Sequence, residues 1–587
     1  MIKQDFIDMK RIDFLSILLM GLFYLINFNS LNAQDFEWAR QFAGTENDEG
    51  RSIAVDASGN VYTAGIFTGT VDFDPGPGVH KLIAYDNIIP DIFISKLDSS
   101  GNFVWVKKLG GLEGEGVTSM VIDESGNVYT TGSFSGYADF DPGAAYYPLH
   151  ATGTGYYPDI FISKLDSSGN FVWAKQMGGS SYEYGEFITL DNSGNIYSIG
   201  AFYNTTDFDP GPQTYNLTAL GLTDIYISKL DTSGAFVWAK QIGGTNFDFG
   251  TSIDIDGTGN IYIAGSFIDT VDFDPGPGVH NLIAGSYESI FMSKLDASGD
   301  FVWAKQFDGT FQDKVIAMTL DEKGNVFTTG SFFDSTDFDP GIDSCYLTSA
   351  GADDVFISKL DSAGNFVWAK QLGGDFYDES YAIATDASGN VYTAGFFYAL
   401  ADFDPGTGSY NLTPVGLLDI FICKLDSSGN FVWARQFGGA QVEYCNSIAL
   451  DPGGKVYSTG CFEGTADFDP GTGIYNLISA GDYDIFVHKM MPNLNTNSKK
   501  VAPAVEVTIS PNPTTGEFIV NIPSLKQDEF TMKVINRLGI VVFAKNYQYS
   551  NNAEHFTANI SVLPNGIYTL LIQQGNTVIV RNVVLIK

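Results

Sequence analysis

The sequence repeats one pentapeptide, Asp-Phe-Asp-Pro-Gly, seven times. Successive copies begin 65 to 68 residues apart. A fixed period of this size is typical of repeat architectures, in which each unit folds as one small supersecondary structure and packs on its neighbours. We therefore expect seven similar units rather than one large core. The copies begin at Asp72, Asp139, Asp207, Asp272, Asp337, Asp402 and Asp467.

Each unit contains two predicted β-hairpins, as the first unit illustrates. Segments 52–56 and 60–65 flank one short turn, and segments 92–97 and 103–107 flank another. Both turns have Asp before a three-residue loop ending in Gly, which is typical of a type I turn closed by a bulge. The four segments, named a to d in chain order, are apolar almost throughout, which indicates burial on both faces. Four-stranded sheets stacked around an axis provide this environment, so the sequence predicts an all-β fold, a β-propeller.

The tryptophans predict how the ring closes. Segment d carries one Trp in six units, but the seventh unit ends after its c segment, residues 484–489, and has none. The remaining tryptophan, Trp38, precedes the first a segment. Residues 36–41 are therefore expected to form the outer strand of the last blade, so that a shared strand closes a seven-bladed β-propeller. The six other tryptophans are Trp105, Trp173, Trp238, Trp303, Trp368 and Trp433.

Residues 1–33 have the features of a secretory signal peptide. A basic pair precedes an apolar segment, 14–26, and small residues follow it. This segment is short for a membrane span, and no later segment is long enough, so no transmembrane span is expected in the mature protein. Two acidic residues near the N-terminus are unusual in a leader. Translation from Met9 instead of Met1 would omit them, and the sequence leaves the start codon open.

The C-terminal part departs from the repeat. Residues 34–490 are assigned to the propeller, 491–504 to a polar linker and 505–587 to a small β-sandwich of short strands. In this last region, Pro-Asn-Pro-Thr-Thr-Gly at 511–516 and Leu-Pro-Asn-Gly-Ile-Tyr at 563–568 precede a final basic strand. These motifs closely resemble the type A C-terminal sorting domain of the type IX secretion system. The alternative is a terminal domain with a structural role only.

The resemblance to the sorting domain implies a route and a partner. Such a domain contacts the secretion machinery, so the protein is expected to be exported. Its final location would be the cell surface, associated with the outer membrane, or the extracellular space.

The repeats resemble a second family. Units of the form Asp-x-Ser-Gly-Asn-Val-Tyr-Thr-x-Gly, followed by Asp-Ile-Phe-Ile-Ser-Lys-Leu-Asp, are similar to SBBP repeats, a bacterial seven-bladed-propeller family. The match covers roughly residues 35–490. It supports the fold and implies little about chemistry.

The charge of the chain excludes some partners. The net charge is −38, and regions 1–33 and 503–587 are close to neutral, so the propeller carries nearly all of it. A surface this acidic repels phosphate backbones and anionic lipids, which argues against nucleic acid or membranes as partners. It is compatible with divalent cations.

The pentapeptide itself has two interpretations. Its two carboxylates could hold calcium through oxygen ligands. The alternative, which the sequence favours, is an ordinary turn in which Asp accepts backbone N–H groups and Pro presets the bend. The candidate calcium ligands are Asp72, Asp74, Asp139, Asp141, Asp207, Asp209, Asp272, Asp274, Asp337, Asp339, Asp402, Asp404, Asp467 and Asp469.

One pair of the four cysteines is a candidate disulfide. Cys445 and Cys461 lie at equal distances on either side of the turn 451–455. Regular antiparallel pairing would place them directly opposite each other, close enough for a bridge in an oxidising compartment. Two small buried thiols are the alternative.

The sequence contains no recognisable catalytic motif. Its five histidines lack metal-ligand spacing, and neither a nucleophile elbow nor a zinc-protease motif occurs. The a–b and c–d turns are uniform and share one face, whereas the b–c and d–a connections on the other face diverge and contain aromatic residues. Binding sites are often built from variable loops on a rigid scaffold.

We therefore expect a secreted or cell-surface binding or scaffold module of the adhesion type, with a glycan or protein ligand on the b–c/d–a loop face. A secreted polysaccharide-acting hydrolase or lyase and a structural surface-layer component are the alternatives.

Overall fold

The computed structural model describes residues 36–491 except 154–156, 286 and 312, and residues 508–587 except 512–513, 522–528, 536–540, 549–554 and 575–576. The predicted signal peptide and nearly all of the predicted linker lie outside these residues. The chain divides into two compact units, Met1–Leu494 and Asn495–Lys587. Every element that the structure describes is a strand.

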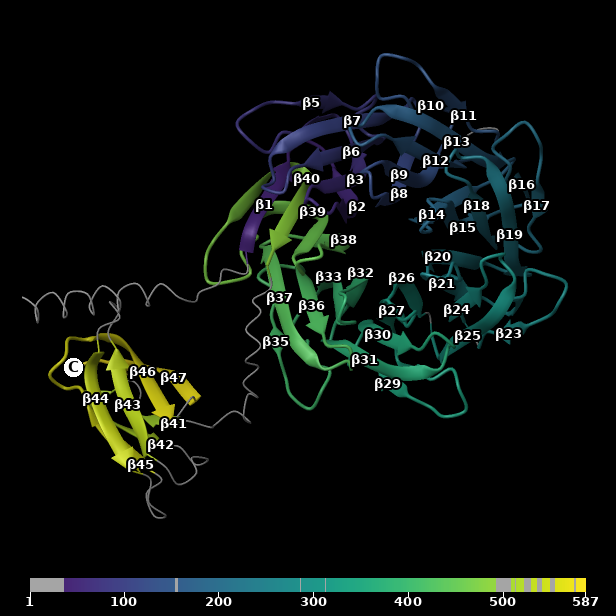
Figure 1. Ribbon diagram of the computed structural model, residues 1–587. Coiled ribbons are helices and arrows are strands. Elements are labelled where there is room, and N and C mark those ends of the chain that lie inside the picture. The colour runs from purple at the N-terminus through teal and green to yellow at the C-terminus, as the bar shows by residue number, and fades with distance from the viewer. Residues whose placement is uncertain are drawn as a thin grey trace, which may run out of the picture. The chain divides into compact units, whose positions relative to one another are not determined.

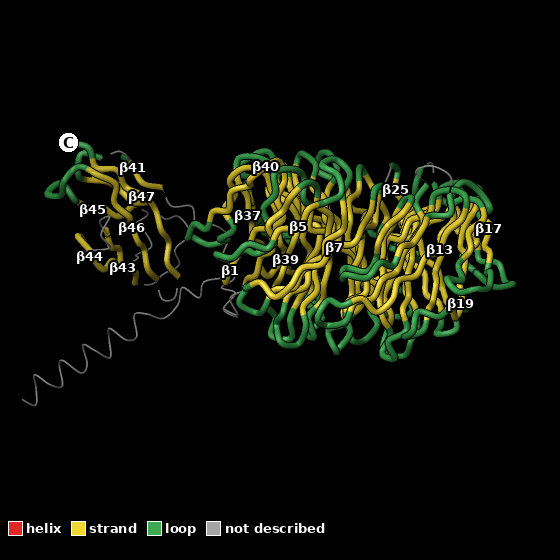
Figure 2. The backbone as a smooth tube through the Cα atoms, turned by 90° about the horizontal axis from the view of Figure 1, so that it is seen from above, coloured by secondary structure: helices red, strands yellow, loops and turns green. Residues whose placement is uncertain are grey.

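The first unit is a β-propeller of seven four-stranded blades arranged around a central axis, with strand a innermost in each blade (Figure 1). Figure 2 shows the strands running between two faces made of loops. In the order a to d, blade 1 consists of β2 (Glu49–Val55), β3 (Val61–Phe67), β6 (Asp91–Leu97) and β7 (Phe103–Gly111). Blade 2 consists of β8 (Glu115–Ile122), β9 (Val128–Phe134), β12 (Asp159–Leu165) and β13 (Phe171–Gly179). Blade 3 consists of β14 (Glu183–Leu190), β15 (Ile196–Phe202), β18 (Asp224–Leu230) and β19 (Phe236–Gly244).

The remaining blades follow the same order. Blade 4 consists of β20 (Asp248–Ile255), β21 (Ile261–Phe267), β24 (Ser289–Leu295) and β25 (Phe301–Gly309), and blade 5 of β26 (Lys314–Leu320), β27 (Val326–Phe332), β30 (Asp354–Leu360) and β31 (Phe366–Gly374). Blade 6 consists of β32 (Asp378–Thr385), β33 (Val391–Phe397), β36 (Asp419–Leu425) and β37 (Phe431–Gly439). Blade 7 consists of β38 (Glu443–Leu450), β39 (Val456–Asp467), β40 (Asn476–Met490) and β1 (Phe36–Phe42).

The last of these strands confirms the predicted closure. β1 pairs antiparallel with β40, and Trp38 lies opposite Lys489. The Trp38 side chain is 7% exposed, and its indole N–H donates to the carbonyl of Ser99 in blade 1 at 3.4 Å. The first strand of the propeller therefore joins the last blade to the first.

The closing strand also carries a charge that the other outer strands lack. Glu37 stands where the six other d strands have Val. Its carboxylate lies 2.7 Å from Lys455 Nζ and 3.2 Å from Lys489 Nζ. Lys455 in turn occupies the last position of the a–b turn, which is Asn in the six other blades. Two substitutions that are specific to this junction thus meet in one ion-pair cluster.

The pentapeptide forms a short hairpin that the sequence did not predict. In blade 2 this hairpin pairs with the outer strand of blade 1, through Ala138 opposite Gly111 and Asp139 opposite Gly110. In blade 7 the same segment extends β39 and β40. Each hairpin therefore links two neighbouring blades. The hairpin strands are β4 (Thr70–Asp72), β5 (Lys81–Ile83), β10 (Tyr137–Asp139), β11 (Pro148–His150), β16 (Thr205–Asp207), β17 (Asn216–Thr218), β22 (Thr270–Asp272), β23 (Asn281–Ile283), β28 (Ser335–Asp337), β29 (Tyr346–Thr348), β34 (Ala401–Asp402) and β35 (Asn411–Leu412).

The uniform turns on the opposite face use their polar groups structurally. Asp56 Oδ1 accepts the backbone N–H groups of Ser58 and Asn60, both at 2.9 Å. Gly59 adopts a φ of 79°, which favours glycine because a side chain would be strained there. The strand-c lysine Lys96 lies over the ring of Tyr62, with Nζ 4.6 Å from its centroid. These repeated residues therefore stabilise each turn and each blade.

The second unit is a small β-sandwich. Its two sheets face each other across one core that includes Phe518, Val520, Met532, Leu570 and Val583. The fold confirms the sandwich predicted for the C-terminal region. One sheet contains β41 (Thr508–Ser510), β42 (Glu517–Asn521) and β45 (His555–Asn559), and the other β43 (Glu529–Ile535), β44 (Val541–Gln548), β46 (Gly566–Gln574) and β47 (Thr577–Leu585).

The cysteine prediction was wrong because of a β-bulge. Asn446 is skipped in the pairing of β38 with β39, so Cys445 lies opposite Gly460, and Cys461 lies opposite Tyr444. Because successive side chains of a strand point to opposite faces, this one-residue shift places the side chains of Cys445 and Cys461 on opposite faces of the sheet. Both cysteines are free buried thiols.

Candidate functional site

Every strand a contains this bulge near its start. In β2 the pairing passes from Gly50 directly to Ser52, which leaves Arg51 outside the register. All seven skipped residues line a cavity of about 780 Å³ on the propeller axis. A bulge turns its extra residue out of the regular alternation, and here that residue faces the channel. These seven residues, which we name the bulge ring, are Arg51, Thr118, Glu186, Thr251, Ile316, Tyr381 and Asn446.

The bulge ring varies although the scaffold around it is uniform. Its seven members comprise six residue types with positive, negative, hydroxyl, amide, aliphatic and aromatic side chains. Strand c, by contrast, has Lys at the same position in all seven blades. The blades are therefore alike in their scaffold, but they contribute side chains of different chemical character to the one cavity.

Three members of the bulge ring connect neighbouring blades. Thr118 Oγ1 donates to the carbonyl of Gly185 at 2.7 Å, and Thr251 Oγ1 donates to that of Val315 at 3.2 Å. Asn446 Nδ2 donates to the carbonyl of Gly50 at 3.0 Å. These three side chains form hydrogen bonds between the inner strands of neighbouring blades. The polar groups of the cavity that remain for a ligand therefore come more from the other four members.

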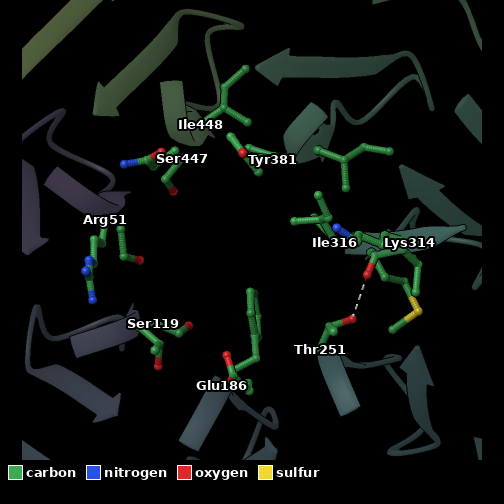
Figure 3. A pocket seen from close by; sticks show the side chains of 18 of the residues that line it. Arg51, Ser119, Glu186, Thr251, Lys314, Ile316, Tyr381, Ser447 and Ile448 are labelled. Carbon is green, nitrogen blue, oxygen red and sulfur yellow. Dashed lines mark hydrogen bonds between the residues drawn. The ribbon is translucent and has the colours of Figure 1, made fainter. Parts of the chain in front are cut away.

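Arg51 and Glu186 place opposite charges in the cavity (Figure 3). Arg51 Nε and Nη2 donate to Glu49 Oε2 at 3.2 and 3.1 Å. The Arg51 guanidinium lies beside Gly116 of blade 2, at van der Waals distance from the position a methyl group there would take. Burial raises the pKa of Glu186 to about 7, and the charge of Arg51 opposes that rise. Glu186 can therefore exchange a proton near neutral pH.

Beyond the bulge ring, the cavity becomes aliphatic. Backbone N–H groups in this layer are satisfied by serine hydroxyls of the preceding blade, as where Met120 N–H donates to Ser52 Oγ at 3.1 Å. The polar and charged groups therefore lie toward one mouth, on the face of the b–c and d–a connections. The apolar lining of this layer includes Ile53, Met120, Met318, Ile383 and Ile448.

Aromatic side chains of the b–c and d–a connections lie on the same face of the propeller as this mouth. Tyr381 of the bulge ring contacts Phe396, with ring centroids 5.7 Å apart, and Phe396 contacts Tyr444 at 5.3 Å. Tyr287 and Phe311 stack with centroids 5.7 Å apart and planes 10° apart. Aromatic faces of this kind remain partly open to solvent over blades 3 to 6. The exposed members are Tyr182, Tyr287, Phe311, Phe376 and Tyr377, each 39–54% exposed.

The candidate calcium ligands lie elsewhere, in the outer hairpins. Asp272 Oδ1 accepts the backbone N–H groups of Asp274 at 3.1 Å and His280 at 2.8 Å. Asp274 Oδ1 accepts the N–H of Gly276 at 2.8 Å. The same bonds recur in the other copies. Among the described residues, no group of three or more His, Cys, Asp or Glu is arranged for a metal ion. The carboxylates thus serve as turn acceptors.

The sequence did carry a signal for the bulge ring. When the seven a segments are placed one under another, the column of Arg51 varies in size and charge between two columns of mostly small residues, and the column of Glu49 varies as well. Sequence reasoning missed it because regular alternation assigns the wrong residues to the axis unless the bulge is known. The loop face was expected to hold the site, and the variable residues extend from those loops into the channel.

Comparisons with known proteins agree with both units. The model for a Beta-propeller repeat matches residues 37–65, 237–266 and 367–395. The model for a Secretion system C-terminal sorting domain matches residues 508–587. An uncharacterized WD repeat-containing protein of Acanthamoeba polyphaga mimivirus is 24% identical over 72% of this chain, and a regulatory protein of Caulobacter vibrioides is 26% identical over 22%. This chain spans 36% and 14% of the length of these two relatives.

A solved structure of a protein of unknown function from Bacteroides caccae covers 59% of this chain and 89% of its own length. It shares 9% sequence identity with this chain and gives a TM-score of 0.28.

The C-terminal domain determines where the protein goes. A type IX sorting domain engages the secretion machinery and directs export to the cell surface or the extracellular space. Within the described part of the chain, no helix is long and apolar enough to span a membrane. The chain is therefore an exported protein built from SBBP-type β-propeller repeats and a type IX C-terminal sorting domain.

Proposed function

We propose that this exported propeller is a carbohydrate-binding module and that it holds a glycan at the channel mouth. The observation that carries the proposal is the bulge ring, which is varied in an otherwise uniform scaffold and lines a cavity of about 780 Å³. Cavities of this size suit small ligands or the end of a chain. The solvent-exposed tyrosine and phenylalanine rings can pack against the apolar faces of sugars, and the polar members can bond hydroxyl groups.

The charge of the protein narrows the ligand class. With a net charge of −38, the surface repels anionic polysaccharides at low ionic strength. Neutral glycans pay no such penalty. We therefore assign a neutral oligosaccharide or polysaccharide as the ligand, and an adhesion-type contact with such a polymer as the role at the cell surface.

Channel variants test the proposal. We expect Arg51→Ala and Tyr381→Ala each to weaken binding of a neutral polysaccharide by about tenfold or more, since each removes an anchor from the cavity. Affinity electrophoresis of the full chain against a panel of soluble neutral and anionic polysaccharides measures the effect. Tyr346→Ala is the matched control, because this tyrosine is 65% exposed on the outer hairpin, away from the channel.

Three outcomes would contradict the proposal. They are equal binding by the channel variants and the control, preference for anionic polymers, and no binding to any glycan by folded protein. Self-association without glycan binding would favour a structural surface-layer component instead.

Glu186 supports hydrolysis of the bound glycan as a second candidate. A carboxyl group with a pKa near 7 suits a general acid that protonates a glycosidic oxygen. Glu186→Gln keeps the shape of the side chain but cannot donate that proton. If the unmodified protein releases reducing sugar and Glu186→Gln binds the glycan without releasing it, the protein is an enzyme. If the unmodified protein releases no reducing sugar, it is a binding module only.

A further inference from the structure

Buried acidic side chains meet at the junctions between blades. The first residue of strand c in one blade and an acid at the start of strand a in the next blade approach each other. Every member of these pairs is at most 2% exposed. Burial of two like charges side by side is costly unless something neutralises them. The pairs are Asp91 with Glu115, Asp159 with Glu183, Asp224 with Asp248, Asp354 with Asp378, Asp419 with Glu443, and Asp484 with Asp48.

In five outer strands a glycine follows the apolar segment and makes room for the pair; blade 4 has Asp308 and the closing strand has Ala43 at this position. A methyl group on Gly373 would lie 2.5 Å from Asp354 Oδ1 and 2.9 Å from Asp378 Oδ2. The two carboxyl groups therefore converge on one point next to the backbone, and any side chain at Gly373 would clash with both. This contact explains the repeated Gly-Gly at the end of strand d.

Each pair lacks at least one hydrogen-bond donor. Asp354 Oδ2 accepts from Ala350 N–H at 2.9 Å and from Gln371 Nε2 at 2.5 Å. Asp378 accepts from the N–H groups of Gly374 and of the residue after strand b. No described residue donates to Asp354 Oδ1. The corresponding unpartnered oxygens of the other pairs without a lysine are Asp48 Oδ2, Asp159 Oδ1, Glu183 Oε2, Asp224 Oδ1 and both carboxyl oxygens of Glu443.

Two junctions reduce the charge by substitution. Between blades 1 and 2, Lys108 Nζ lies 2.7 Å from Asp91 Oδ2, where the six other blades have Gln, although neither carboxyl oxygen of Glu115 has a hydrogen-bond partner among the described residues. Between blades 4 and 5, Ser289 replaces the strand-c acid opposite Asp313. The described side chains at the five remaining junctions supply no lysine or arginine to the pair. At these five junctions, the negative charge of the carboxyl pair must be neutralised by something other than a protein side chain.

We infer that each of these five carboxyl pairs binds one proton, which supplies the missing donor and cancels one charge. The ring is then a proton-binding assembly with five equivalent sites between blades. One neutral carboxyl group donates to the unpartnered oxygen of the other, and the pair becomes a satisfied hydrogen-bonded dyad. Loss of these protons leaves two buried charges at each junction and loosens the contacts between blades.

The electrostatic surroundings support this assignment. Burial, with the partner acid adding to it, raises the pKa of Asp48, Glu183 and Glu443 to about 8 and that of Asp248 and Asp378 to about 7. Nearly all other charged groups that face the pairs are acids, which favour the proton further; the exception is His150 beside Asp159. The facing acids are Glu46, Asp269, Asp353 and Glu463.

The inference fixes the direction of the pH dependence. Because the pKa of the pair is higher in the folded chain than the value of about 4 in the unfolded chain, the folded state binds more protons between these values. Stability from the pairs is complete below about pH 4 and is lost as the pH rises through 7 to 8. We expect the thermal midpoint of the full chain at about pH 9 to lie about 10 °C below that at about pH 6.

Three comparisons test the inference by thermal unfolding. The double variant Glu183→Gln/Glu443→Gln, whose side chains stay neutral and can donate, should show a smaller drop between the two pH values. Glu322→Gln, an exposed acid in an a–b turn, should keep the full drop. The third comparison is EDTA against calcium chloride, and the midpoint should be the same in both.

An equal midpoint at both pH values would overturn the inference, as would an undiminished drop in the double variant. A midpoint that calcium raises and EDTA lowers, with the effect lost in the double variant, would also overturn it and assign the pairs to a divalent cation.

Discussion

Deletion of residues 35–42 is expected to open the ring and abolish cooperative folding of the propeller. The deletion removes β1, whose six paired positions with β40 close the last blade. It also removes the buried side chains of Phe36, Trp38 and Phe42, each worth about 1.5–3 kcal/mol of burial. The exposed edge of β40 would then invite association with other chains. Thermal unfolding and size-exclusion chromatography measure both effects.

A charge-neutral pair of substitutions is the control for this deletion. Glu37→Val/Lys455→Asn restores the residues found at these positions in other blades and removes the ion-pair cluster while keeping the strand. The partly exposed Glu37–Lys455 pair contributes about 0–1 kcal/mol, and the buried Lys489 keeps the carbonyl of Ser99 as an acceptor at 2.7 Å, so the variant should stay closed. An unchanged thermal midpoint after the deletion, or opening by the charge variant alone, would refute closure by strand sharing.

Asp272→Ala is expected to cost about 2–3 kcal/mol of stability, because it leaves the N–H groups of Asp274 and His280 without their acceptor. Asp272→Asn should cost far less, since the amide oxygen can accept both bonds. Chemical denaturation of the two variants and the unmodified chain, with EDTA or calcium chloride, measures the difference. The same pattern is expected at the equivalent Asp of any blade.

The pair of variants separates a turn acceptor from a calcium ligand. A calcium site would lose affinity in both variants because each removes a negative charge. If calcium stabilises the unmodified chain and stabilises both variants less, because one of the seven copies no longer binds it, the pentapeptide is a metal motif. Equal destabilisation by Asn and Ala would likewise contradict the turn role.

Much of the fold was predictable because the repeated turns mark where each strand begins and ends in every unit. The tandem turns, the apolar strands and the displaced Trp38 together predicted seven blades and a shared closing strand, and the structure confirms both. The terminal sandwich followed from the alternating short strands of residues 505–587, and the motifs at 511–516 and 563–568 identified the sorting domain. In each case a local pattern, repeated or specific, carried enough information to identify a non-local contact.

The rest depended on contacts that leave no local pattern. The outer hairpins pair with the preceding blade through strands of two or three residues, which are too short for a recognisable alternation. The bulge at Arg51 and its counterparts shifts each inner strand by one residue. That shift invalidated the Cys445–Cys461 bridge and concealed the channel-facing residues. The buried carboxyl pairs join adjacent blades and become visible only when the ring is assembled.

Hydrogen–deuterium exchange of the full chain with and without the tightest-binding neutral polysaccharide tests the glycan site most directly. We predict that the glycan slows exchange in the inner strands around the channel mouth, at 49–53, 184–188 and 379–383. The outer hairpins, such as 70–83, should be unaffected. Protection confined to those hairpins or to the uniform turns of the opposite face would contradict a ligand site at the channel mouth.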